Sequence, residues 1–169
     1  MVKRKFRQFG EDLLNKKGAF TVPIDYDHDT QIDVFGVRTR KLQSTHYYDK
    51  ELTSKNFAKT TNRLEPGKTY AIKMFPVLEI VQSEDCLAFL RENNAIFAGA
   101  QGLTALQDDQ PDVFPTGRYG ISFGKKDADG DRWVPSVRRD SDGDWWFRLG
   151  YLRNCWGSDY VLVCFCELD

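Results

Sequence analysis

The stretch Tyr160-Val-Leu-Val-Cys-Phe-Cys166 decides the fold that this sequence predicts. It is apolar almost throughout and lacks the polar alternation of a strand that has one face in water. Such runs are typical of strands that are covered on both faces. We therefore expect a central strand here, with the helices predicted between residues 83 and 106 covering one of its faces.

The segments before this strand are short, β-like and separated by turn residues. They comprise residues 120–123, 132–137 and 145–151. Short strands at this spacing are typical of a meander, in which neighbours along the chain pair as antiparallel hairpins. The last third of the chain therefore predicts a C-terminal β-meander.

Two copies of Asp-x-Asp-Gly-Asp-x-Trp lie in this region, at residues 127–133 and 140–146. Asp-Gly between strand-like segments favours a two-residue type I′ turn, because both central residues then take positive φ. Turns centred on Asp129-Gly130 and Asp142-Gly143 fix a register for each hairpin. The expected cross-strand pairs are Asp127 with Arg132, Lys126 with Trp133, Asp140 with Trp145, and Arg139 with Trp146.

Calcium binding is the alternative interpretation of the repeats, because carboxylate oxygens are the ligands that this hard cation prefers. The candidate ligands are the six repeat carboxylates, Asp127, Asp129, Asp131, Asp140, Asp142 and Asp144. Neither copy has the Gly at position six or the Glu at position twelve that an EF-hand loop requires. The sequence therefore favours hairpin turns over a metal site.

The first two thirds of the chain predict helices and a few strands. Phe6 to Lys17 has the apolar spacing of a short amphipathic helix, whereas Ala19–Tyr26 and Ile32–Val37 have strand-like patterns. Residues 69–81 predict a core strand with a kink at Phe75-Pro76. Ser83 is typical of a helix N-cap, and a second helix is expected from Ala100 to Leu106.

Together these elements predict a single α+β domain at residues 19–169, in which two short helices pack on a mainly antiparallel sheet. Residues 1–18 form a basic N-terminal arm or short helix in this prediction, with six basic and two acidic side chains. A basic arm can contact nucleic acid through phosphates, and its candidate residues are Lys3, Arg4, Lys5 and Arg7. Nucleic-acid contact is the second of two functional hypotheses.

The composition of the 169 residues is that of a soluble globular protein, with 41% apolar and 29% charged residues. No apolar run approaches the roughly 20 residues of a membrane span, and no apolar stretch follows the N-terminal charges as in a signal peptide. A cytoplasmic location is the resulting expectation. The four cysteines form no C-x-x-C pair, so we expect buried free thiols and no cofactor.

The first functional hypothesis is a non-enzymatic binding module. The chain lacks the sequence motifs of hydrolases, phosphate-binding loops and zinc proteases, so no catalytic residue is predicted. Aromatic and Arg residues are instead concentrated near the predicted hairpins, as in protein interfaces. The candidate residues for a protein or carbohydrate partner are Trp133, Trp145, Trp146, Arg148, Tyr151 and Trp156.

The segment Tyr48-Asp49-x-x-Leu-Thr-Ser-Lys-Asn-Phe57 resembles one found in a broad group of uncharacterised bacterial proteins of unknown function. The similarity covers residues 45–167 and includes Val134-Pro135, Leu149-Gly150-Tyr151 and Trp156-Gly157. A fainter similarity, in layout only, is to the C-type-lectin-like fold, where two helices precede a β-rich tail ending in an aromatic strand. Two of that fold's sugar-binding triplets, Glu-Pro-Asn and Trp-Asn-Asp, do not occur in this chain. Its sugar binding is therefore not implied.

Overall fold

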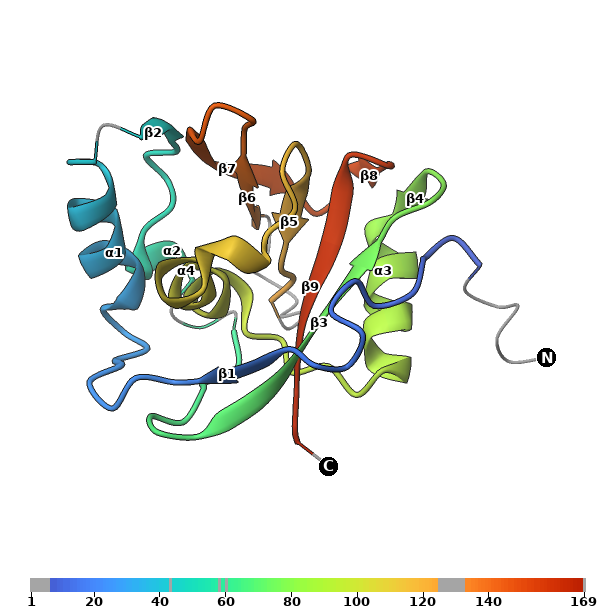
Figure 1. Cartoon of the computed structure of the whole chain (residues 1–169), viewed down its shortest axis with the longest axis horizontal. Helices are drawn as coiled ribbons and strands as arrows, with labels where there is room; N and C mark the ends of the chain where they lie inside the picture. Colours follow the sequence, from blue (N-terminus) through green and yellow to red (C-terminus); the bar gives the residue numbers. More distant parts are fainter. Residues whose placement is uncertain (1–6, 43, 58, 60, 125–132, 169) are drawn as a thin grey trace.

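A computed structural model describes residues 7–42, 44–57, 59, 61–124 and 133–168 of the chain. Figure 1 shows a twisted sheet with helices on both sides. Seven strands form this sheet in the order β1-β3-β9-β5-β6-β7-β2, and β4 pairs with β8 in a second, two-stranded sheet. The described part of the chain is thus an α+β domain.

The strands are β1 (Ala19–Thr21), β2 (Thr45–Tyr48), β3 (Thr69–Pro76), β4 (Val81–Gln82), β5 (Tyr119–Ile121), β6 (Trp133–Arg139), β7 (Trp145–Tyr151), β8 (Cys155–Trp156) and β9 (Tyr160–Cys166). The helices are α1 (Gln31–Thr39), α2 (Ser54–Phe57), α3 (Ser83–Glu92) and α4 (Gly99–Asp109), with a 3-10 turn, η2 (Pro111–Val113). Among the described residues, no helix has the length and apolar character needed to cross a membrane.

Strand β9 lies inside the large sheet and is buried on both faces, which confirms the prediction for residues 160–166. Val161, Val163 and Phe165 belong to one core, whereas Leu162, Cys164 and Cys166 belong to the other. β9 pairs antiparallel with β3 and parallel with β5. The chain therefore returns from the meander β5-β6-β7 to insert its last strand between β3 and β5.

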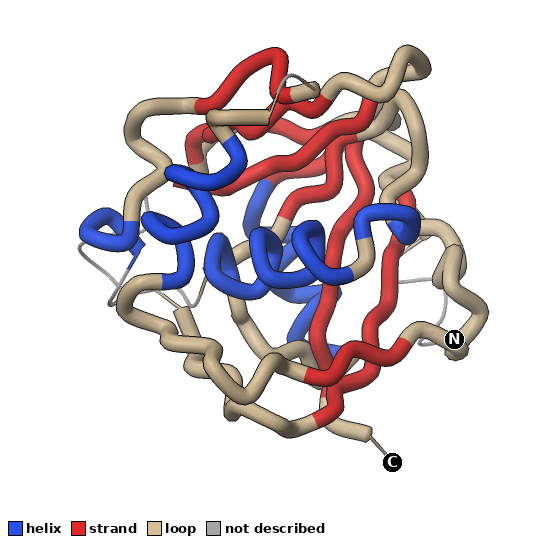
Figure 2. Tube along the Cα trace, turned by 60° about the vertical axis from the view of Figure 1, so that its left-hand side comes forward, coloured by secondary structure: helices blue, strands red, loops and turns tan. Residues whose placement is uncertain are grey.

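Helices α3 and α4 cover opposite faces of this sheet, so the expectation that they share one face is wrong (Figures 1 and 2). α4 contributes Leu103 and Leu106 to the first core, and α3 contributes Leu87 and Leu90 to the second. The connection between them passes β9, where the Ile96 amide donates a 2.7 Å hydrogen bond to the Phe165 carbonyl. Helices joined in this way lie on either side of the strand.

The β6-β7 hairpin forms as predicted, but its predicted register is wrong. Arg139 pairs with Trp145, and Arg138 pairs with Trp146. The Asp140 amide donates to the Asp144 carbonyl at 2.8 Å, and Gly143 alone in this loop has a positive φ, of 89°. The loop therefore has three residues with a left-handed glycine at its end, which displaces every pair by one residue relative to a two-residue turn.

Two predicted elements near the N-terminus are also wrong. Residues 7–17 contain no helix within the described chain; instead they run beside β3, where Asp12 accepts hydrogen bonds from the amides of Leu14, Lys16 and Met74. The expected strand at Ile32–Val37 lies within α1. The helical spacing of Ile32, Phe35 and Gly36, which are buried together, outweighs the short alternating pattern.

Candidate functional site

One face of the large sheet carries a cluster of aromatic and Arg side chains at the β5-β6-β7 end. It is the same face of the sheet that α3 covers at strands β3 and β9. We call this cluster the Arg148 face and define it by its five central residues, Tyr119, Arg138, Trp146, Arg148 and Tyr160. Their placement follows from strand alternation, because paired residues on neighbouring strands project to the same face.

Arg148 is exposed, and its neighbours orient it. Its Nη1 donates a 3.0 Å hydrogen bond to the Tyr119 hydroxyl, and the guanidinium carbon lies 5.5 Å from the centre of the Tyr119 ring. This hydrogen bond raises the pKa of Arg148 above its ordinary value. Among the described residues, no carboxylate lies within 4.0 Å of the Arg148 guanidinium.

Tyr119 and Tyr160 form the aromatic wall beside Arg148. Their rings are stacked, with centroids 5.6 Å apart, because β5 and β9 pair in parallel with Tyr119 opposite Tyr160. Burial raises the pKa of Tyr160, although the nearby Arg148 acts in the opposite direction. The Tyr160 hydroxyl is therefore protonated at neutral pH and available as a hydrogen-bond donor.

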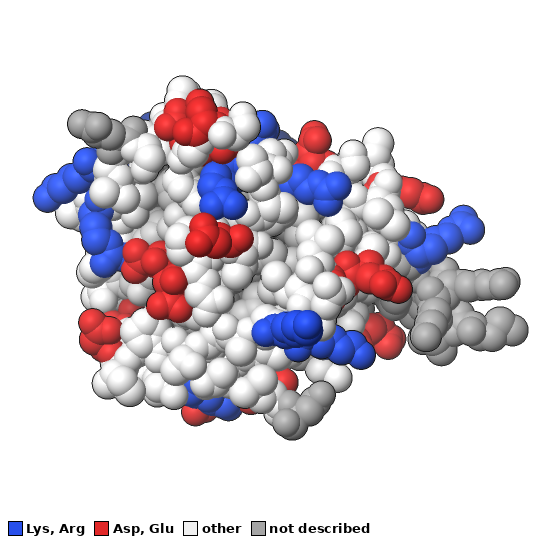
Figure 3. Space-filling model, in the orientation of Figure 1, with Lys and Arg blue, Asp and Glu red and all other residues white. Residues whose placement is uncertain are grey.

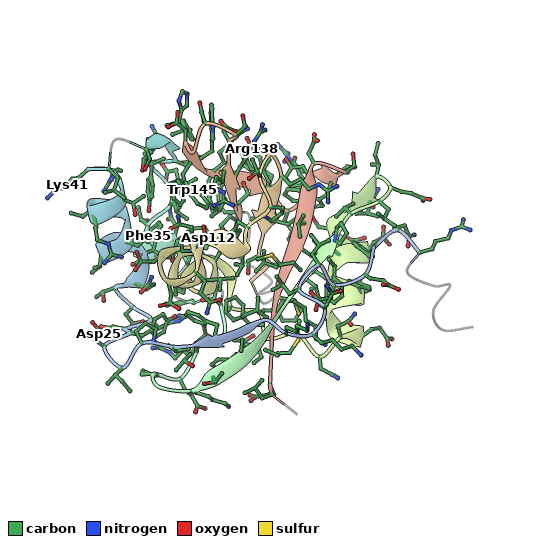
Figure 4. The ribbon with its side chains drawn as sticks, in the orientation of Figure 1. Asp25, Phe35, Lys41, Asp112, Arg138 and Trp145 are labelled. Carbon is green, nitrogen blue, oxygen red and sulfur yellow. The ribbon has the colours of Figure 1, made fainter. Side chains whose placement is uncertain are left out.

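Arg138 differs from Arg148 because a carboxylate neutralises it. Its Nε lies 2.9 Å from Asp140 Oδ1, and Trp146 Nε1 donates a 2.6 Å hydrogen bond to the other oxygen of Asp140. Figure 4 labels Arg138 among the strands at this end of the sheet. Asp140 thus neutralises the charge of Arg138 and orients the Trp146 ring.

The Trp146 ring extends the Arg148 face onto the edge strand β2. Its centroid lies 4.2 Å from that of His46 and 6.1 Å from that of Tyr47. Both of these β2 side chains are exposed, and Trp146 is half-buried. An exposed aromatic surface therefore adjoins a cationic group.

A pocket of about 240 Å³ lies next to Arg148. Its lining includes Tyr119, Ser136, Arg148, Asn154, Trp156 and Tyr160. Trp156 is 2% exposed, and its indole Nε1 donates a 2.8 Å hydrogen bond to the Ser83 hydroxyl. Ser83, predicted as an N-cap, is instead the first residue of α3, after the N-cap Gln82. The pocket thus combines polar groups with an aromatic ring anchored in the core.

The residues predicted to form one binding patch are divided between two faces. Trp146 and Arg148 lie on the Arg148 face, whereas Trp133 and Trp145 pack against the first core, on the face that α4 covers. Trp145, which is labelled in Figure 4, meets Phe114 edge-on, with ring centroids 6.0 Å apart. Tyr151 is exposed and contacts Trp133, with ring centroids 5.0 Å apart.

Sequence reasoning missed Tyr119, Tyr160, Arg138 and the β2 residues His46 and Tyr47. A three-residue loop in the β6-β7 hairpin would have placed Arg138 beside Trp146. Tyr119 and Tyr160 come together through the parallel pairing of β5 with β9. They are distant in sequence, and no motif signals that pairing.

Of the candidate calcium ligands, only Asp140, Asp142 and Asp144 belong to the described residues; Asp127, Asp129 and Asp131 lie outside them. Asp140 binds Arg138 and Trp146, and Asp142 Oδ1 accepts a hydrogen bond from the Asp144 amide at 3.2 Å. Within the described part of the chain, no group of three or more His, Cys, Asp or Glu is arranged to hold a metal ion.

The basic arm is only partly described. Lys3, Arg4 and Lys5 lie outside the described residues, and Arg7 is exposed. On the face shown in Figure 3, acidic and basic side chains are interspersed. Nucleic-acid contact through the arm stays a prediction.

Comparison with protein-family models, curated proteins and solved structures finds no match for this chain. The resemblance to uncharacterised bacterial proteins stays a prediction, and the geometry of the Arg148 face is the basis for assigning a function.

Proposed function

We propose that this chain is a non-enzymatic binding module that presents the Arg148 face to a protein or carbohydrate partner. The observation that carries the proposal is the oriented state of Arg148, which Tyr119 holds beside a pocket while no carboxylate of the described residues pairs with it. An oriented cation next to aromatic rings is the kind of group that dominates binding energy in interfaces.

The surroundings of Arg148 agree with a binding role. Trp146 and Tyr47 provide aromatic area, and both lose little side-chain freedom on binding because they are already packed together. The pocket adds polar groups that can set specificity, since an unmatched partner would leave them unpaired.

The order of elements supports a second, finer proposal about the fold. Helices α3 and α4 precede the meander β5-β6-β7, and β9 follows it. This is the order in the C-type-lectin-like layout, so we propose that the chain is a distant variant of it. The proposed site uses the sheet face around Arg148, because the oriented guanidinium and the pocket lie there.

The proposed function predicts that a partner depends on the aromatic part of the face. The purified chain would be screened on a glycan array and used to capture proteins from a lysate, and the dissociation constant of each purified hit would then be measured. We expect Tyr47→Ala and Trp146→Ala each to weaken the binding of a true partner by about tenfold or more, as truncation of an aromatic anchor does.

Arg38→Ala is the matched control, because Arg38 is an exposed Arg on α1 that pairs with Asp108 away from the Arg148 face. It should leave the affinity unchanged. A partner that binds the Tyr47 and Trp146 variants as tightly as the unaltered chain would refute the proposal. Thermal melts show whether each variant is folded.

A further inference from the structure

The pocket beside Arg148 has the chemistry of a site for one negatively charged group. We infer that it binds a single carboxylate of the ligand, held by the Arg148 guanidinium and neighbouring hydroxyl and amide donors. This inference rests on the proposed function, because it names the group that the Arg148 face recognises.

The charges around the pocket select a monoanion. Arg138 is neutralised by Asp140, which leaves Arg148 as the cation of the pocket without a carboxylate within 4.0 Å among the described residues. Asp159 lies close enough to raise the pKa of Tyr160, so it adds negative potential nearby. Phosphate sites usually rely on several cations or a helix N-terminus. One guanidinium in the pocket lining, beside an acidic group, suits a carboxylate better than a dianionic phosphate.

The donors around the pocket match two carboxylate oxygens. The Tyr119 hydroxyl accepts a hydrogen bond from Arg148, so its own proton can be donated to a ligand. The Tyr160 hydroxyl and the Asn154 side chain are further donors in the lining. Because guanidinium presents its N–H groups as a planar fork, it can bind a carboxylate through two parallel hydrogen bonds.

The size of the pocket restricts what accompanies the carboxylate. Its volume of about 240 Å³ is below the range of roughly 300–1,000 Å³ that is typical of pockets for drug-sized ligands. It therefore suits one sugar ring or one side chain. The Trp156 indole in its lining provides an apolar contact for the carbon atoms next to the carboxylate.

Small probes with a single carboxylate test this inference. They also distinguish two sources of the carboxylate, a sugar acid and an acidic amino-acid side chain. The isotope-labelled chain would be titrated with glucuronate or with glucose as its neutral analogue, and with N-acetylglutamate N-methylamide or its neutral glutamine counterpart. NMR would follow the Arg148 Nε–H and the Gly150 and Asn154 amides. We expect saturable shifts with millimolar dissociation constants for one or both carboxylates. The neutral analogues should bind at least about tenfold more weakly, because they lack the charge-assisted hydrogen bonds.

Variants of Arg148 connect the binding to the proposed group. Arg148→Gln should weaken carboxylate binding by about tenfold or more, whereas Arg148→Lys keeps the charge without the fork and should weaken it less. Tyr119→Phe removes the hydrogen bond that orients Arg148 and should also weaken carboxylate binding. This variant tests the inference even if Arg148→Gln does not fold. Arg153→Gln is the matched control, because Arg153 lies exposed over the Tyr151 ring next to the pocket.

Two results would overturn the inference. Carboxylate binding that is unchanged in Arg148→Gln and Tyr119→Phe would do so, and so would inorganic phosphate or the neutral analogues binding as tightly as the carboxylates. Failure of this inference can be distinguished from failure of the proposed function. If the affinity of a partner depends on Trp146 and Tyr47 but not on Arg148, the proposed binding function stands and the carboxylate inference fails.

Discussion

At the scale of single residues, Gly150 and Trp156 set the shape of the pocket. A Cβ added at Gly150 would lie 2.8 Å from Cη2 of the Trp156 ring. This ring cannot move easily, because Ser83 accepts its N–H and Phe123 and Tyr160 flank it at centroid distances of 5.9 and 5.0 Å. Glycine at position 150 is thus required by packing against a fixed side chain.

Gly150→Ala should therefore reduce the free energy of unfolding by about 1–3 kcal/mol, the usual cost of overpacking a core. Chemical denaturation of the variant would measure the loss. Gly157→Ala is the control, since among the described residues its added Cβ would meet only Ile80, at 3.9 Å. This variant should change stability by less than about 0.5 kcal/mol. Equal stabilities of the two variants would contradict this account of the pocket.

At the scale of elements, the β6-β7 hairpin loop decides which side chains meet on the Arg148 face. Its three-residue loop places Arg138 beside Trp146 and Arg139 beside Trp145, where the Arg139 guanidinium lies 5.7 Å from the Trp145 ring centre. A shift of one residue would move every β7 side chain relative to β6. The left-handed conformation of Gly143 therefore contributes directly to the geometry of the site.

Gly143→Ala should destabilise the chain by about 1 kcal/mol or slightly more, because a Cβ is disfavoured at a φ of 89°. No atom of the described residues lies within 4 Å of that Cβ, so the effect isolates backbone strain from steric contact. Gly143→Asn should cost less, since Asn tolerates the left-handed region better than Ala. Urea denaturation measures both, and an alanine variant as stable as the unaltered chain would show that the loop adopts another conformation.

At the scale of the whole molecule, two cores on opposite faces of one sheet bury several ionisable groups in their neutral forms. Burial raises the pKa of Cys86 and of Tyr48 to about 12 from ordinary values of 9.0 and 10.0. Burial also raises the pKa of Tyr26, and the neighbouring Cys166 thiol raises that of Cys164. In the unfolded chain, these groups lose their protons at lower pH than in the folded protein.

The free energy of unfolding should therefore fall with rising pH. The contributions of Cys86 and Tyr48 are present in full below about pH 9 and pH 10, respectively, and are lost by about pH 12, because the unfolded state binds fewer protons in that window. Denaturation under reducing conditions at several pH values from 8 to 11 would measure the loss. Tyr48→Phe should reduce the slope of the free energy of unfolding against pH above pH 10. Tyr47→Phe, at an exposed position, should leave this slope unchanged. Identical slopes for all three proteins would contradict the assignment to Tyr48.

Several elements could be predicted because their signals are local. The apolar run of β9, the bounds of β7 and the approximate positions of α3 and α4 agree with the periodicity of their own residues. Local patterns were less reliable where two periods overlap. Residues 32–37 alternate like a strand, but Ile32, Phe35 and Gly36 also have helical spacing, and burial of that face decides in favour of α1.

The sequence by itself determined the α+β class, the doubly buried central strand and the β6-β7 hairpin, because side-chain period and turn chemistry act over a few residues. Only the tertiary structure decided that β9 inserts between β3 and β5, and that Tyr119 and Tyr160 meet beside Arg148. The β5-β9 pairing joins residues about 40 apart and the β3-β9 pairing joins residues about 90 apart, and both depend on which faces are buried together. A contact of this range leaves no periodic signal in either strand, so the candidate site could be located only after the strands were assembled.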